Sequence, residues 1–194
     1  MRKQMVRFMV EIAIYTALSL VLELLCSNFL GFAWLNGGSI SIACIPIFVA
    51  GYKYGLKGGL LCGLLVGVIQ LFWSKYLLNP IQVSLDYVIP NVVAGLVGLV
   101  GNVVANTNNS KVKRVVYIAI SIALVFVLRI LSTTISGILY WETPFWASLS
   151  YNASYDSLSC LIDIILVIPL VFNSFIMKLS LIHISEPTRP ISIS

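Results

Sequence analysis

The sequence predicts an all-α membrane protein with six transmembrane helices and both termini in the cytoplasm. Of its 194 residues, 59% are hydrophobic and only 10% are charged, whereas roughly a quarter of the residues are charged in ordinary soluble domains. The mean hydropathy is +1.00. The apolar runs are continuous rather than alternating, which disfavours a membrane β-barrel. Little of the chain is left for a soluble domain.

The expected helices fill residues 1–178, which we interpret as a single transmembrane domain. About 20 apolar residues cross a bilayer, so a chain of this length accommodates five or six spans, and its apolar runs define six. The second helix is short. We expect helices over residues 5–28, 40–53, 57–74, 82–105, 113–140 and 151–177.

The positions of the basic residues predict the orientation. The net charge of +5 does not indicate nucleic-acid binding, because the lysines and arginines form short clusters between apolar runs. Such clusters remain in the cytoplasm. This rule puts both termini, the turn at 53–57 and the loop at 105–114 inside the cell. The connections at 29–39, 75–81 and 141–150 then face outward.

Individual helices carry further structural signals. The first lacks a small-residue cleavage site and is therefore a span rather than a signal peptide, and its Glu11 follows Arg7 by one turn, at ion-pair spacing. Arg129 in the fifth helix and Asp163 in the sixth both lie about 18 Å from the outer ends at about 1.5 Å per residue. We expect these two to form a buried ion pair. Glycines four residues apart predict close packing of the third helix, and they are Gly51, Gly55, Gly59, Gly63 and Gly67.

Polar and aromatic residues gather at the outer ends of the helices, where a polar residue is a functional candidate. Gln82 and Asp86 share one helix face, as do Asn152 and Asp156. Aromatic rings attract cations, a carboxylate supplies a countercharge, and an amide both donates and accepts hydrogen bonds. Together they predict a pocket for a flat cationic ligand, although an interfacial belt is the alternative for the aromatic residues. The aromatic members are Trp34, Tyr76, Tyr87, Trp141 and Tyr151.

Motifs for other chemistries are absent from the sequence. It has no GxxxxGK[ST] loop for an ATP site of its own, and no HExxH or GxSxG motif. None of the four cysteines forms a CxxC pair, so neither a metal site nor a disulfide is expected. We therefore predict neither an enzyme nor a bound cofactor.

The last segment, residues 179–194, differs from the rest of the chain. Its LIHISEPTRPISIS stretch is polar, contains two prolines and resembles a peptide translated by accident from sequencing-adapter DNA. We expect a non-native tail here. The tail, with the single histidine His183, is left out of the functional assignment.

Four stretches, taken in order, resemble the substrate-binding S component of an energy-coupling factor (ECF) vitamin transporter, specifically the thiamine-specific type. They are EIAIYTAL, GGSISIACIPI, NPIQVSLDY, and ISGILYW followed by SLSYNASY. The resemblance implies a six-helix protein of a prokaryotic plasma membrane that captures a vitamin at its outer face. It also implies docking on a separate transmembrane T subunit, which two cytoplasmic ATPases drive.

The resemblance further implies roles for single residues. Asp86 would balance the thiazolium charge or bind the aminopyrimidine, Trp141 would stack on the ligand, and Asn152 would bond to the pyrimidine. Ala13 and Ala17, two small residues one turn apart, would contact the T subunit, with ordinary helix packing as the alternative. The remaining substrate-binding positions would be Trp34, Tyr76, Tyr87, Thr133 and Tyr151.

Two positions depart from the family pattern, so the resemblance does not fix the identity of the ligand. Thr133 stands where the family often has a histidine, and Ala147 where some members have a tyrosine, for which Tyr151 could substitute. Another small vitamin or a thiamine precursor is therefore an alternative ligand. A stand-alone secondary transporter would require an inverted repeat or broken midplane helices, and we find no convincing internal repeat. In a purely structural membrane protein, Asp86, Trp141 and Asn152 would point to different faces.

Overall fold

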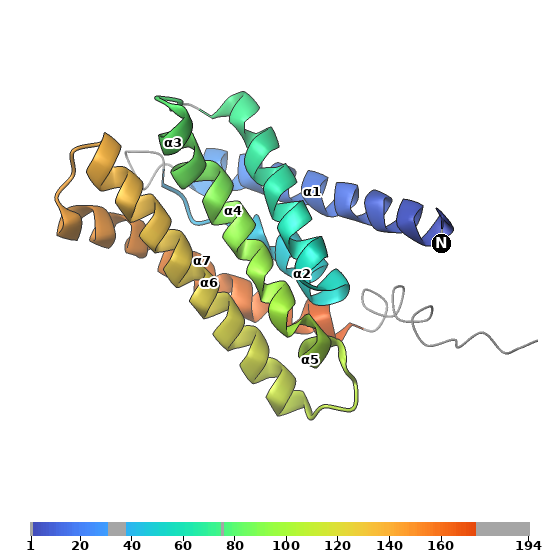
Figure 1. The fold of residues 1–194 in the computed structure, drawn as a ribbon. Helices are drawn as coiled ribbons and strands as arrows, with labels where there is room; N and C mark the ends of the chain where they lie inside the picture. Colours follow the sequence, from blue (N-terminus) through green and yellow to red (C-terminus); the bar gives the residue numbers. More distant parts are fainter. Residues whose placement is uncertain (1, 31–37, 75, 174–194) are drawn as a thin grey trace, which may run out of the picture.

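The computed structural model describes residues 2–30, 38–74 and 76–173, and in these ranges the chain is helical without strands, as predicted. Trp34 and the tail at 179–194 lie outside the described residues. Figure 1 shows the helices packed into one bundle. Five described segments are long and apolar enough to cross a membrane: Lys3–Leu30, Cys44–Trp73, Pro80–Ala105, Lys111–Tyr140 and Phe145–Phe172.

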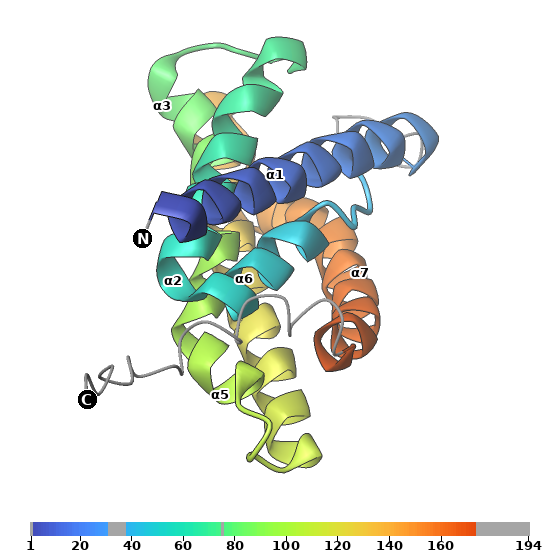
Figure 2. The same cartoon turned by 90° about the vertical axis from the view of Figure 1, so that its right-hand side faces the viewer.

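Helix α1 (Arg2–Leu30) packs on α2 (Cys44–Ile69) and runs across the direction of the other helices (Figure 2). Its inner face buries Ile12, Thr16 and Ser19, and the Ser19 hydroxyl donates a hydrogen bond of 2.7 Å to the carbonyl of Ala43. Its opposite face is apolar and exposed. In a membrane protein, an exposed apolar helix face of this kind can contact lipid.

The predicted helices 40–53 and 57–74 form one helix with two arms, α2, which begins at Cys44 rather than at residue 40, and the 3-10 turn η2 (Gln70–Trp73) extends it. Gly55 interrupts the helix with φ 69° and ψ −164°, a backbone conformation almost confined to glycine. The chain changes direction at this break (Figure 2). The first arm lies in the core, because every residue from Ile45 to Tyr52 is buried. A segment that is apolar on all sides is expected to occupy such a position.

The fourth predicted helix is a rod with five consecutive geometries: α3 (Pro80–Val83), the π-helical turn η3 (Ser84–Val88), α4 (Ile89–Ala94), the 3-10 helix η4 (Gly95–Val100) and α5 (Gly101–Ala105). It lies between α2 and α6 (Lys111–Tyr140), as Figure 1 shows. A Cβ atom at Gly59 would overlap the carbonyl of Gly95, and one at Gly98 would lie 2.5 Å from the carbonyl carbon of Gly55. The predicted close packing is confirmed at four members of the glycine series, where a Cβ would come within 3.0 Å of the rod: Gly51, Gly59, Gly63 and Gly67. At Gly55 the nearest atom would be 4.0 Å away.

Helices α6 and α7 (Phe145–Phe172) form a hairpin (Figure 1). The side chain of Ser110 caps α6 by accepting the N–H of Lys113 at 3.2 Å. The expected start of the last helix at residue 151 is wrong, because α7 begins at Phe145, directly after Pro144. The serines and the asparagine in the first turns of α7 are therefore helical and hold fixed directions.

The ion pairs are only partly as predicted. Arg7 and Glu11 pair at 3.0 Å, and Glu11 also binds the buried ammonium group of Lys53. The expected Arg129–Asp163 pair is wrong. Arg129 lies 4.0 Å from Asp156, whereas the buried Asp163 carboxylate has no hydrogen-bond partner. Asp156 and Asp163 are seven residues apart and share a face of α7, so periodicity could not tell which of the two the guanidinium reaches.

Candidate binding pocket

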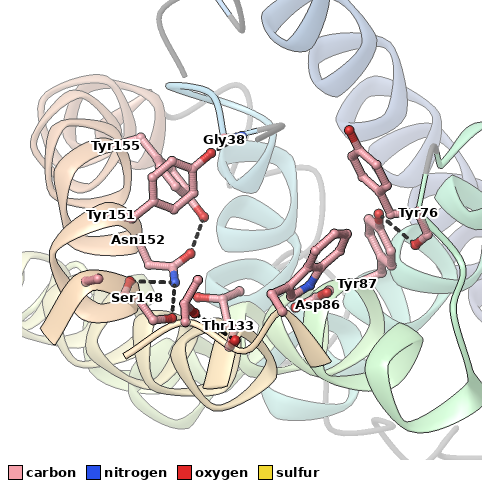
Figure 3. Close-up of a pocket in the computed structure, with 13 residues that line it drawn as sticks. Gly38, Tyr76, Asp86, Tyr87, Thr133, Ser148, Tyr151, Asn152 and Tyr155 are labelled. Atoms are coloured by element: carbon pink, nitrogen blue, oxygen red, sulfur yellow. Dashed lines mark hydrogen bonds between the residues drawn. The ribbon is translucent and has the colours of Figure 1, made fainter. Parts of the chain in front are cut away.

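A cavity of about 500 Å³ lies at the end of the bundle where η3, the α6–α7 turn and the first turns of α7 meet (Figure 3). This volume falls within the range of small-molecule pockets. All seven predicted substrate-binding residues that the structure describes line it: Tyr76, Asp86, Tyr87, Thr133, Trp141, Tyr151 and Asn152. The expectation that Asp86, Trp141 and Asn152 share one cavity is thus confirmed.

The rod brings Asp86 to the cavity wall. Asn79 caps α3 by accepting the N–H groups of Ile81 and Gln82, and Pro80 occupies the first helical turn, where its missing N–H costs nothing. The Gln82 side chain is fully buried, accepts the N–H of Leu78 at 3.0 Å and donates to the Asp86 carboxylate. Gln82 therefore holds the carboxylate in one direction although it does not line the cavity.

An aromatic pair forms another part of the wall. The rings of Tyr76 and Trp141 meet edge to face, with centroids 5.2 Å apart, an arrangement that the ring quadrupoles favour. The Tyr87 hydroxyl donates to the backbone carbonyl of Tyr76 at 3.3 Å, which ties the segment before the rod to the π turn. Tyr76 and Trp141 are each 40% exposed, so their ring surfaces are only partly covered by the protein.

Helix α7 supplies a hydrogen-bonded polar wall. The Asn152 amide is buried; its Nδ2 donates to the Ser148 carbonyl at 2.9 Å, and its Oδ1 accepts the Tyr155 hydroxyl at 2.6 Å. The hydroxyl of Tyr151 accepts the N–H of Gly38 at 3.0 Å. Dashed lines in Figure 3 mark the bonds around Asn152. Because these bonds fix the amide plane, Asn152 can present only one edge to a ligand.

Thr133 lines the cavity from α6, but its hydroxyl donates to carbonyls of its own helix, 3.1 Å from that of Arg129 and 3.2 Å from that of Ile130. The hydroxyl oxygen retains its capacity to accept a hydrogen bond. The threonine side chain is also smaller than the histidine that the family often has at this position, so it leaves more of the cavity volume unfilled.

The sequence reasoning missed several residues of the wall. Ser148 and Tyr155 flank Asn152 at helical spacing on α7, and Gly137 follows Thr133 by one turn on α6. Helical periodicity could have identified these three. Gly38 and Thr143 lie outside helices and carried no comparable signal. The residues of the wall that were not predicted are Gly38, Gly137, Thr143, Ala147, Ser148 and Tyr155.

The chemistry of the cavity suits a flat, positively charged, hydrogen-bonding molecule. Asp86 supplies a negative charge, the aromatic rings supply faces and edges, and Asn152 supplies an oriented amide. Within the part of the chain that the structure describes, no three histidine, cysteine or carboxylate side chains group into a metal site. Fold and cavity together define a polytopic membrane protein with a pocket for a small organic molecule.

Comparisons with known proteins agree with this class. Residues 9–179 match the family described as thiamine transporter protein. The chain is 35% identical over 163 residues to the thiamine transporter ThiT of Bacillus subtilis (strain 168), covering 79% of this chain and 83% of that protein. The solved structure of ThiT from Listeria monocytogenes shares the fold, with a TM-score of 0.65 and 23% identity over 90% of this chain and 95% of that one.

The chain belongs to the thiamine transporter family. Its apolar helices and its bacterial relatives identify it as a multi-pass protein of a prokaryotic plasma membrane.

Proposed function

We propose that this protein is the substrate-capture subunit of an ATP-driven ECF importer and that it binds thiamine in the cavity described above. The observation that carries the proposal is the convergence of Asp86, Trp141 and Asn152 on one cavity. Thiamine has a cationic thiazolium ring joined to an aminopyrimidine, and the three side chains supply a charge, a ring and an amide. Membership of the thiamine transporter family supports the same ligand.

Each side chain has a distinct role in the proposed complex. Asp86 pairs with the cationic ring or with the amino group of the pyrimidine, and Trp141 stacks on a ring face. Asn152 bonds to the pyrimidine edge. Tyr76, Tyr87, Thr133 and Tyr151 complete the walls, and Trp34 of the first outer connection is a further substrate-binding residue in this proposal. The chain itself catalyses no reaction and requires no cofactor.

The proposed topology counts the two arms of α2 as separate spans. Six spans then put both termini in the cytoplasm and the cavity at the outer face, consistent with the clusters of basic residues. Ala13 and Ala17 lie on the exposed face of α1 and contact the T subunit, where small residues let helices approach closely. Two cytoplasmic ATPases supply the energy for import.

Titration calorimetry of the purified full chain in detergent tests the ligand. We expect saturable thiamine binding. The Asp86→Asn variant should weaken it by about 2 kcal/mol, roughly 30-fold, because a charge partner of the ligand is lost. Glu142→Gln is the matched control, since it removes an exposed carboxylate in the α6–α7 turn that does not line the cavity.

Two outcomes would contradict the ligand assignment. A folded wild type that binds no thiamine rejects thiamine and redirects the search to thiamine precursors, riboflavin and pantothenate. Equal losses in the Asp86→Asn and Glu142→Gln variants would reject the pocket. Tryptophan fluorescence gives a second reading, because thiamine should quench Trp141 but not Trp146, which is 76% exposed and does not line the cavity.

Co-purification with the T subunit and the two ATPases tests the transporter assignment. Ala13→Leu together with Ala17→Leu should abolish assembly but leave thiamine affinity unchanged, because the added side chains block close helix contact. Ala123→Leu, a change at an exposed alanine of α6, is the control. Unimpaired assembly of the double variant would reject the α1 contact.

A further inference from the structure

The π-helical turn η3 carries Asp86 and Tyr87 at the cavity wall. Its defining hydrogen bond runs from the N–H of Ile89 to the carbonyl of Ser84, five residues earlier. A π turn accommodates one extra residue in a helix and is frequent at functional sites. Each residue of a regular helix rotates by about 100°. The register of this turn therefore decides whether the side chain of residue 86 faces the cavity.

The π turn leaves one backbone carbonyl without a helical donor. In the π register the carbonyl of Leu85 would accept the N–H of residue 90, but residue 90 is a proline, which has no N–H. The regular α-helical donor, the N–H of Ile89, already bonds to Ser84. A buried carbonyl without a partner destabilises the conformation that exposes it, so this turn requires a donor from elsewhere.

Helix α6 supplies that donor. Ser132 is 6% exposed, and its hydroxyl donates to the carbonyl of Leu85 at 2.7 Å. One turn earlier on the same helix, Arg129 donates to the carbonyl of Pro90 at 3.1 Å. The two side chains hold carbonyls of Leu85 and Pro90, on either side of Asp86 and Tyr87. Ser132 does not itself line the cavity.

We propose that Ser132 is a positioning residue for ligand binding: its hydroxyl stabilises the π turn and thereby directs the Asp86 carboxylate into the cavity. The proposal rests on the proposed function, because it assumes that Asp86 binds the ligand. Without the hydroxyl, the turn relaxes toward the regular register, in which Ile89 donates to Leu85. Asp86 then rotates away from the cavity. Arg129 alone does not prevent this change, because its bond lies beyond the π turn.

Thiamine affinity of the full-length protein gives the first test. Ser132→Ala should weaken binding by about tenfold, as expected for the loss of one buried hydrogen bond, and Ser132→Thr, which keeps a hydroxyl, should restore most of the affinity. Ser136→Ala is the matched control. Ser136 lies one turn along the same helix and is fully buried, but its hydroxyl has no hydrogen-bond partner. We expect no change in affinity there.

A double-mutant cycle separates positioning from a general loss of structure. If Ser132 acts through Asp86, Ser132→Ala should weaken binding less than about twofold when Asp86→Asn is already present, because coupled residues are not additive. The proposal is overturned if Ser132→Ala weakens binding equally in both backgrounds, or if it has no effect in the wild-type background.

A second readout requires no ligand. In an Asp86→Cys variant, a small water-soluble thiol reagent should label residue 86 from the cavity, and adding Ser132→Ala should slow the labelling severalfold, whereas adding Ser136→Ala should not. The wild type, with its own four cysteines, gives the background rate. Unchanged labelling overturns the positioning role even if thiamine binds. Slowed labelling in a protein that binds no thiamine would instead reject the proposed function alone.

Discussion

The two ends of the rod Pro80–Ala105 are built on different physical principles. At the end formed by Gly95–Ala105, backbone packs against backbone, and glycines of the rod meet glycines of α2 with no side chain between them. At the end formed by Pro80–Val88, the Ser132 side chain of α6 holds the carbonyl of Leu85, and the Gln82 side chain of the rod holds the N–H of the preceding Leu78. The packing of the Gly95–Ala105 end (the glycine end) depends on the absence of side chains at its glycines. The structure of the Pro80–Val88 end (the cavity end) depends on particular hydrogen-bond donors and acceptors.

This difference explains the irregular helical geometry. The 3-10 stretch η4 carries Gly95 and Gly98, which lie directly against the backbone of α2, and the π turn η3 lies where a carboxylate and a phenol line the cavity. A 3-10 helix is narrower than an α-helix, and a π turn is wider. The same span is therefore narrow where it packs and wide where it contributes to the pocket. We expect substitutions at the glycine end to affect stability and those at the cavity end to affect affinity.

The largest effect is expected for Gly59→Val. Its Cβ would overlap the carbonyl of Gly95, and backbone on both sides leaves nothing that can move aside. We expect a loss of at least about 3 kcal/mol in the free energy of unfolding, seen as a large drop in the thermal unfolding midpoint in detergent. Leu64→Val, at a 44% exposed position of the same arm, should change the midpoint little. Equal midpoints for the two variants would contradict the close packing.

Gly55→Ala should have a smaller effect with a different cause. A Cβ here would make an ordinary van der Waals contact without overlap, because the nearest atom, the Gly98 carbonyl oxygen, is 4.0 Å away. The cost is conformational, because φ 69° and ψ −164° are essentially reserved for glycine, and it should be about 1–3 kcal/mol. Lys57→Ala, two residues further at an exposed position, is the control. Thiamine affinity of the folded fraction should not change, and a large loss of affinity would show that the break affects the cavity.

Tyr155→Phe should act only at the cavity end. It removes the hydroxyl that donates to Asn152 at 2.6 Å, so the amide is less firmly oriented. We expect thiamine to bind about fivefold more weakly, in line with the loss of a single hydrogen bond, with little change in the unfolding midpoint. Tyr117→Phe, at a 39% exposed position of α6, should alter neither quantity. A drop in the midpoint without a loss of affinity would assign Tyr155 to the structure rather than to binding.

The sequence predicted the membrane class and the approximate helices because lipid imposes strong constraints on composition. A span must be apolar over its length, so 113–140 could be recognised from hydropathy alone and differs from α6 by two residues at its start. The glycine series was similarly informative, since small residues spaced by four on one helix face are typical of close backbone contact in lipid. The start of α7 was missed because the SLSYN segment (148–152) is polar. Polar residues in a helix that borders a pocket give the same sequence signal as a loop.

The cavity was predicted by combining the chemistry of single residues with a family resemblance, and the predicted residues that the structure describes all line it. Individual partnerships were less predictable. Arg129 reaches Asp156 rather than Asp163, and Gln82 was noticed only as a neighbour of Asp86 although it is fully buried and holds the carboxylate. Periodicity indicates the face of a helix on which a side chain lies, but not the rotation and height of the facing helix.

Composition, charge clusters and the period of four between glycines are sufficient to specify an all-α membrane protein with a close-packed helix pair. These are local properties, and each constrains a single segment in lipid. The π register at Ser84–Val88, the donor from Ser132 and the choice of Asp156 by Arg129 were decided only when α6, α7 and the rod packed together. Their energies come from hydrogen bonds and charges between segments far apart in sequence, which exist only at the distances that the packed bundle sets.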